Sequence, residues 1–207
     1  MKRRSILVLS AICLIAICAA VSLGVSASTE RTIATIGEYK ITESTLKTYV
    51  ILSSAQGDSE DTIEQSVKLY ARAQIAANEI SGTTYDIPKN YKKELLRLEK
   101  MNFEREYETN MALCRQSGIS REELIRAVVT SKCNTFVEER HFSLVADRYR
   151  EEGETSYTAD ELTKIYENYM DRRLEELEFV SEDNEKLKAI ASSVSLSSET
   201  IKNATYD

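Results

Sequence analysis

The amino-acid sequence predicts a mainly α-helical protein: an elongated multi-helix domain with a short N-terminal β-hairpin. Turn residues are scarce, with six Gly and one Pro among 207 residues, whereas a β-sandwich or barrel needs a turn about every 8–12 residues. Apolar residues make up 42% and charged residues 29% of the chain, which is typical of a globular protein rather than a disordered one. From residue 43 onward, apolar side chains recur at helical spacing.

The first 27 residues have the layout of a secretory signal. Lys2, Arg3 and Arg4 precede an apolar run over residues 6–23, and small residues follow up to Ala27. The run is long enough to approach a membrane span, so an uncleaved N-terminal membrane anchor through residues 5–25 remains the alternative to cleavage after Ala27. Both alternatives place the rest of the chain outside the cytoplasm, either secreted or tethered to the outer face of the cell membrane.

Charge narrows the class of partner. Residues 1–27 hold three of the 27 basic residues and none of the 34 acidic ones, so the remaining chain has a net charge of −10. Nucleic acids and anionic membrane surfaces both attract clustered positive charge. We therefore expect no nucleic acid partner, and membrane contact only through residues 5–25 if they are retained.

The domain begins with a predicted hairpin and two helices. Residues 32–42 alternate around the pair Gly37-Glu38, which suits a two-residue hairpin turn. A helix is predicted over residues 43–55 and a second from about residue 58 to Gly82. Pro88 suits the first turn of a third helix, which the apolar spacing continues without a break to Gly118.

Two capping boxes predict the next helix starts. Ser120 is followed three residues later by Glu123, and Thr158 by Glu161. The first box opens a helix that ends near Gly153. A short amphipathic helix over about residues 182–192 precedes a Ser-rich tail. We therefore divide the chain into residues 1–27, a helical domain over 31–180, and a C-terminal segment over 181–207.

The two cysteines beyond residue 27 are predicted to be free thiols. Cys114 and Cys133 flank the turn at Gly118, and on antiparallel helices their heights would differ by 11 residues, or about 16 Å. A disulfide needs Cα atoms within about 7 Å. The sequence also has no CxxC motif and no Cys/His cluster, so it predicts neither a redox motif nor a metal site.

No sequence motif indicates catalysis. The one histidine, His141, lies on an apolar helical stripe without a partner at i±4, so we expect a packed structural side chain. Nucleotide-binding glycine motifs and the G-x-S-x-G nucleophile motif are missing. We therefore expect no enzyme and no cofactor.

The order of these signals resembles the bacterial SurA-like and PrsA-like extracytoplasmic chaperones, whose chaperone module shares its architecture with the peptide-binding arms of trigger factor. The resemblance covers residues 31–175 and rests on the hairpin of residues 33–42 with the helix start after it, the turn of residues 118–124, and the helix start of residues 158–166. Where that family has an Asn-Gly turn in the hairpin, this chain has Gly37-Glu38. Many members carry a parvulin-type prolyl isomerase domain of about 90 residues after the last of these motifs. Only 32 residues follow residue 175, so the isomerase activity is not carried over.

The resemblance implies an ATP-independent chaperone that binds unfolded or extended segments of exported polypeptides in a cleft between helices. Aromatic and Met side chains at helical spacing would line such a cleft or fill the core. The candidates for substrate binding are Tyr107, Met111, Tyr166, Tyr169 and Met170. The alternative hypothesis is an exported helical adaptor that holds one folded partner and has no chaperone activity.

Overall fold

The structure is a computed structural model that describes residues 30–53, 59–152 and 156–194. The chain divides into two units, Met1–Glu30 and Arg31–Asp207, and all the described helices and strands lie in the second. The predicted signal segment, the ends of the predicted helices near Gly57 and Gly153, and the Ser-rich tail lie outside the described residues.

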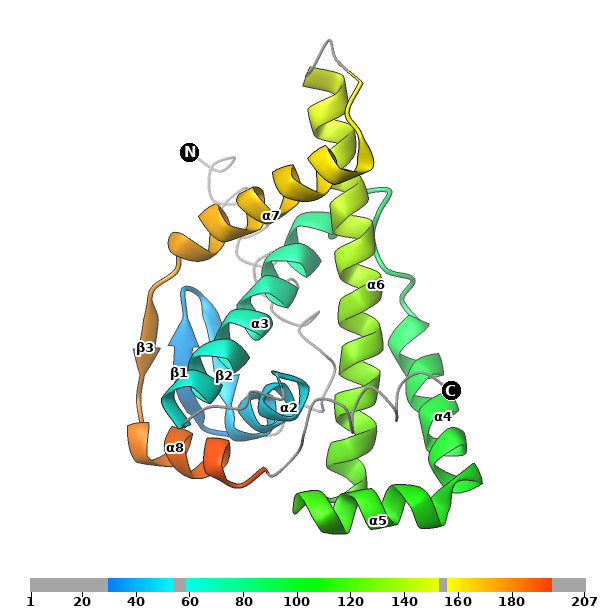
Figure 1. Ribbon diagram of the computed structural model, residues 1–207, viewed down its shortest axis with the longest axis vertical. Helices are drawn as coiled ribbons and strands as arrows, with labels where there is room; N and C mark the ends of the chain where they lie inside the picture. The colour runs from blue at the N-terminus through cyan, green and yellow to red at the C-terminus, as the bar shows by residue number, and fades with distance from the viewer. Residues whose placement is uncertain (1–29, 54–58, 153–155, 195–207) are drawn as a thin grey trace, which may run out of the picture. The chain divides into compact units, whose positions relative to one another are not determined.

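The second unit is mainly helical, with a short N-terminal hairpin, and this confirms the predicted fold class (Figure 1). The described elements, in chain order, are β1 (Thr32–Ile36), β2 (Tyr39–Thr42), α2 (Glu43–Ser53), α3 (Ser59–Ile80), α4 (Tyr91–Arg105), α5 (Tyr107–Ser117), α6 (Arg121–Glu152), α7 (Ala159–Glu175), β3 (Phe179–Ser181) and α8 (Asn184–Ser192).

The hairpin belongs to a three-stranded antiparallel sheet in the order β2-β1-β3. Gly37 occupies the turn with a φ of +55°, a conformation that favours glycine. The third strand was not predicted, and the domain boundary expected after residue 180 falls within it. Beyond β3, α8 packs on α2 and α3, so this C-terminal segment contributes to the same core as the hairpin.

Helix α6 is the central element of the helical part, because α2, α3, α4, α5 and α7 all contact it. Its buried side chains contribute to three apolar clusters along its length. Both predicted capping boxes are confirmed. Ser120 Oγ accepts from the backbone N–H of Glu123 at 3.2 Å, and Thr158 Oγ1 accepts from that of Glu161 at 3.3 Å.

The prediction of a single helix between Pro88 and Gly118 is wrong. The chain forms two helices, α4 and α5, which meet at Glu106, where φ is −118° and ψ is 37°. Phe103 before the break and Leu113 after it are both buried in the cluster around the first half of α6. Tertiary packing therefore bends a segment whose local sequence, without Gly or Pro at the break, favours a continuous helix.

Candidate functional site

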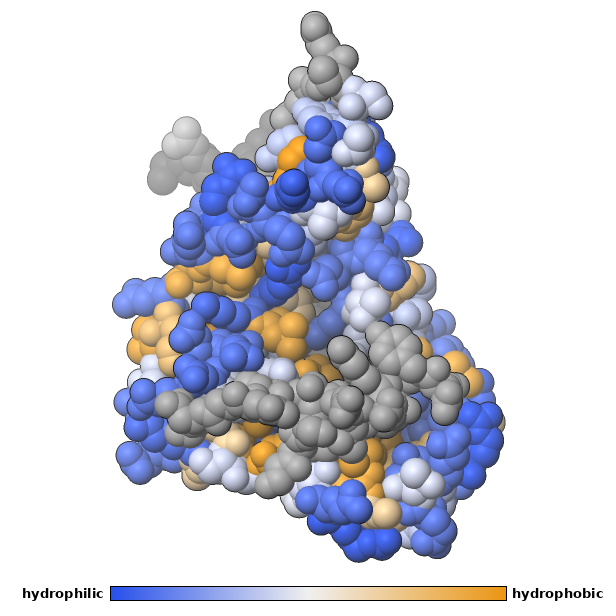
Figure 2. All heavy atoms as spheres, in the orientation of Figure 1, coloured by the Kyte–Doolittle hydropathy of each residue, from blue (hydrophilic) through white to orange (hydrophobic). Residues whose placement is uncertain are grey.

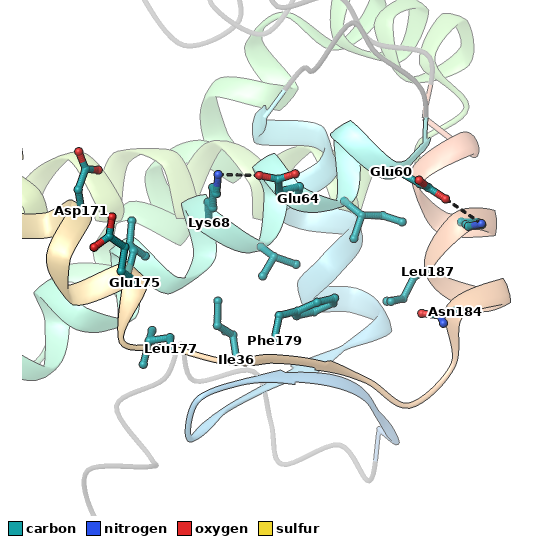
Figure 3. Close-up of a pocket in the computed structure, with 14 residues that line it drawn as sticks. Ile36, Glu60, Glu64, Lys68, Asp171, Glu175, Leu177, Phe179, Asn184 and Leu187 are labelled. Carbon is teal, nitrogen blue, oxygen red and sulfur yellow. Dashed lines mark ion pairs between the residues drawn. The ribbon is translucent and has the colours of Figure 1, made fainter.

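The candidate site is a groove of about 710 Å³ between α3, the C-terminal end of α7, β3 and α8. Its apolar lining includes Ile36, Ile63, Val67, Leu174, Phe179 and Leu187. In Figure 3, Ile36 and Phe179 point from the strands toward α3, while Leu187 projects from α8 at one end. Figure 2 shows hydrophobic surface over β3 and between α7 and α3, bordered by hydrophilic side chains. The groove is therefore an apolar surface that remains open to solvent.

The amphipathic pattern of α3 explains one wall of this groove. Ile63 and Val67 are four residues apart on one face and are buried against the sheet and α8. Glu60, Glu64 and Lys68 also lie four apart and follow the adjacent face, so they form the rim. An apolar stripe and a charged stripe thus run side by side along one helix.

Strand β3 supplies the opposite wall. Phe179 pairs with Ile36 across β1 and β3, and its side chain is 40% exposed, while its neighbour Val180 is 48% exposed. Isolated exposed apolar residues are ordinary on protein surfaces. Phe179 lines the apolar groove, whereas Val180 lies on the opposite face of the strand. A contiguous apolar surface such as the one around Phe179 marks a binding site more often than scattered residues do.

The rim of the groove is predominantly acidic. Lys68 pairs with Glu64 at 2.6 Å, and Lys188 pairs with Glu60 at 3.1 Å. Two further carboxylates, Asp171 and Glu175, line the end formed by α7 (Figure 3). Among the described residues neither forms an ion pair, although Lys68 is near enough to Asp171 for their charges to interact. The groove therefore favours a ligand with a positive charge at that end.

The five candidates from the sequence do not line this groove. Tyr107 and Met111 lie on α5, where Tyr107 is 44% exposed and Met111 packs partly buried on the cluster around the first half of α6. Tyr166 and Met170 lie on α7 and are buried against α3 and α6. Tyr169 packs partly buried beside them. The structure thus separates the candidates into two groups and places Tyr166 and Met170 in the core.

His141 is fully buried and belongs to a polar network between α3, α6 and α7. Its Nε2 lies 3.1 Å from Glu79 Oε2, and its Nδ1 lies 3.2 Å from the hydroxyl of Tyr166. The hydroxyl of Tyr169 also donates to Glu79, at 2.5 Å, and Arg173 Nε donates to the second carboxylate oxygen at 3.1 Å. Local sequence patterns do not indicate Glu79 as a partner, because it lies 62 positions from His141.

The network controls the ionisation of Glu79. Burial alone would raise the pKa of this carboxyl group, but the hydrogen bonds from His141 and Tyr169, the charge of His141 and the hydrogen bond from Arg173 lower its pKa to about 2. Burial, with the hydrogen bond to Glu79, raises the pKa of Tyr169 to about 12. Both ring nitrogens of His141 have partners, and its side chain is inaccessible to solvent. The network is consequently a structural link between three helices.

Further chemistry is limited in the described part of the chain. Residues 30–53, 59–152 and 156–194 contain no group of three His, Cys, Asp or Glu side chains arranged to hold a metal ion. Within the same residues, no helix is both long and apolar enough to cross a membrane. Cys114 and Cys133 are buried free thiols, as the sequence predicted.

Comparison with known proteins gives no further guide to function. The chain matches no protein-family model, no curated protein and no solved structure.

Proposed function

We propose that this protein is an exported, ATP-independent chaperone-like protein that binds extended segments of unfolded polypeptides in the groove between α3, α7, β3 and α8. The observation that carries the proposal is the open apolar groove with an acidic rim and the exposed side chain of Phe179 in its wall. The export signal in the sequence and the resemblance to extracytoplasmic chaperones support the same function. The proposed groove contains none of the five residues expected from the sequence to bind substrate, which are Tyr107, Met111, Tyr166, Tyr169 and Met170.

Binding in this groove would be weak and reversible. Each apolar side chain that leaves water for the groove contributes about 1.5–3 kcal/mol. The cost of ordering a flexible segment offsets much of what a few such side chains provide. Weak binding suits a protein that must release its clients without a nucleotide-driven step, and it delays aggregation by covering apolar segments.

An aggregation assay with a matched pair of variants tests the proposal. The purified chain should suppress aggregation of a reduced, unfolded model protein, and Phe179→Asp should lose most of that effect. Leu98→Asp is the control, because Leu98 on α4 is 42% exposed and lies outside the groove. Circular dichroism checks that both variants keep their helical content.

Two results would contradict the proposal. The first is no suppression by the wild-type chain at severalfold molar excess. The second is an equal loss in both variants. Crosslinking that captures one folded partner in stoichiometric amount, with no preference for unfolded chains, would favour the adaptor hypothesis instead.

A further inference from the structure

Strand β3 has a free edge beside the groove. The sheet order is β2-β1-β3, so β3 pairs with β1 on one side, and no other described strand pairs with its second side. Backbone N–H and C=O groups on an open edge are ready to pair with another extended chain. An inference from this edge rests on the function proposed above and specifies how the groove would bind its polypeptide.

The register of β1 and β3 identifies the groups on the free edge. The N–H of Gly37 donates to the carbonyl of Glu178, and the N–H of Glu182 donates to the carbonyl of Ile33, both at 2.9 Å. In an antiparallel pair, alternate residues direct their backbone groups to the same side. The backbone N–H and C=O groups of Val180 therefore face β1, whereas those of Phe179 and Ser181 face outward.

The same alternation places the side chains of Phe179 and Ser181 on the groove side of β3. Phe179 lines the groove. Ser181 Oγ is buried and has no hydrogen-bond partner among the described residues. A buried hydroxyl without a partner is unfavourable. The apolar surface on this face of β3 thus lies directly beside the outward backbone groups of Phe179 and Ser181 on the free edge.

The charges around the edge favour a basic partner over a second copy of the chain. Glu178 and Glu182 flank β3. If two copies paired antiparallel through β3, centred on Val180, Glu178 of each would lie opposite Glu182 of the other, and like charges in such positions are destabilising. Asp171 and Glu175 add negative charge at the α7 end of the groove. A segment with Lys or Arg would meet attraction at the same positions.

We propose that the groove binds its polypeptide by strand addition. An extended segment pairs with the outward backbone groups of Phe179 and Ser181, directs alternate apolar side chains into the groove, and places a Lys or Arg against Asp171 and Glu175. Backbone hydrogen bonds provide affinity that does not depend on sequence, and the groove selects the apolar and basic side chains. The ligand class is therefore an extended apolar segment with a basic residue at its end.

Backbone methylation of a probe peptide separates strand addition from simple apolar contact. The probe is a fluorescent seven-residue peptide with alternating Val and Thr between terminal Lys residues. Its binding to the purified full-length chain is followed by fluorescence anisotropy. One derivative is N-methylated at every Val and another at every Thr, so each removes the donors from one edge of the peptide. We expect the Val-methylated peptide to bind about tenfold more weakly than the parent. In antiparallel addition, the residues whose side chains enter the groove also direct their backbone N–H groups toward β3, and methylation removes these donors.

Each outcome of this comparison decides something different. Weakened binding of only one methylated peptide supports strand addition. If the weakened peptide is the Thr-methylated one, the added strand is parallel to β3. Equal affinity of both methylated peptides and the parent overturns strand addition and leaves groove binding intact. Failure of the parent peptide to bind overturns the inference, while the aggregation assay independently decides the proposed function. A dimer in analytical ultracentrifugation that the parent peptide does not dissociate also overturns it, because a second copy would then occupy the edge.

Charge variants test the position of the basic residue. Asp171→Asn combined with Glu175→Gln should weaken binding of the parent peptide about threefold to tenfold at low salt, and added salt should remove the difference. The control combines Glu108→Gln with Glu122→Gln, which changes the net charge equally on exposed sites of α5 and α6. Equal weakening by both pairs would show a general charge effect and overturn the assignment of this end.

Discussion

Glu79 on α3 and His141 on α6 meet at 3.1 Å between carboxylate Oε2 and ring Nε2, although the residues are 62 positions apart. His141 is fully buried, and the side chain of Glu79 is only 16% exposed. Tyr169 and Arg173 on α7 bind the same carboxylate. One acidic side chain therefore connects three helices, and α7 leads directly to the groove and to β3 (Figure 1).

Replacing Glu79 with Gln should destabilise the protein. The amide keeps the size of the side chain but removes the charge, and its NH₂ group donates where His141, Tyr169 and Arg173 need an acceptor. We expect the free energy of unfolding to fall by about 2–3 kcal/mol, since buried polar partners lose their hydrogen bonds. Urea denaturation measures it. Glu94→Gln is the control, because Glu94 pairs with Arg97 on an exposed face of α4, so its replacement should change the stability little. Equal stability of Glu79→Gln and wild type would contradict the structural role of the network.

The same carboxylate predicts a pH dependence of stability. The pKa of Glu79 is about 2 in the folded protein, against an ordinary value of 4.5. Because the folded pKa is the lower one, the stabilisation is complete above about pH 4.5 and is lost as the pH falls toward 2. Its size is about 3 kcal/mol. Urea denaturation between pH 6 and pH 2.5 should show a steeper acid loss in wild type than in Glu79→Gln. Parallel curves for the two proteins would place the acid sensitivity elsewhere.

Features encoded locally could be predicted from the sequence. The hairpin turn at Gly37 and the two capping boxes depend on residues within three positions of one another, and the structure confirms each. The amphipathic helices follow from local apolar spacing in the same way. A local pattern carries such information because neighbouring residues alone determine whether the backbone groups at a turn or helix end are satisfied.

The groove and the buried network could not be predicted in this way. Strand β3 has three residues, and its pairing with β1 joins Phe179 to Ile36 across most of the chain. His141 stands on its helix without a polar neighbour at i±4, and its partners come from α3 and α7. The break at Glu106 has no Gly or Pro to mark it. Each of these features depends on contacts between distant segments, which local spacing does not encode.

Gly37→Ala should destabilise the sheet that forms one wall of the groove. Gly37 has a φ of +55°, and a Cβ atom there would lie 2.7 Å from Cδ2 of Leu177. Backbone strain and this close contact together should cost about 2 kcal/mol. Gly82→Ala is a matched control, because its φ is +74° but its added Cβ would have nothing within 4 Å. It should lose only about 1 kcal/mol through strain. If thermal denaturation shows equal losses for both variants, the contact with Leu177 contributes nothing.

Cys114 and Cys133 should remain reduced in an oxidising environment while the protein is folded. Both thiols are buried in the cluster around the first half of α6, and burial raises the pKa of each. The reactive form of a cysteine is the thiolate, so a raised pKa and low exposure both slow its reactions. In a variant with Cys13→Ser and Cys18→Ser, which leaves only these two thiols, a thiol-specific colorimetric reagent should label both cysteines slowly in the native protein and rapidly in urea. Mass spectrometry after exposure of the native chain to oxidised glutathione should find neither an internal disulfide nor a glutathione adduct on these residues. Rapid labelling of either thiol without denaturant would show that the helices around α6 open more readily than their packing indicates.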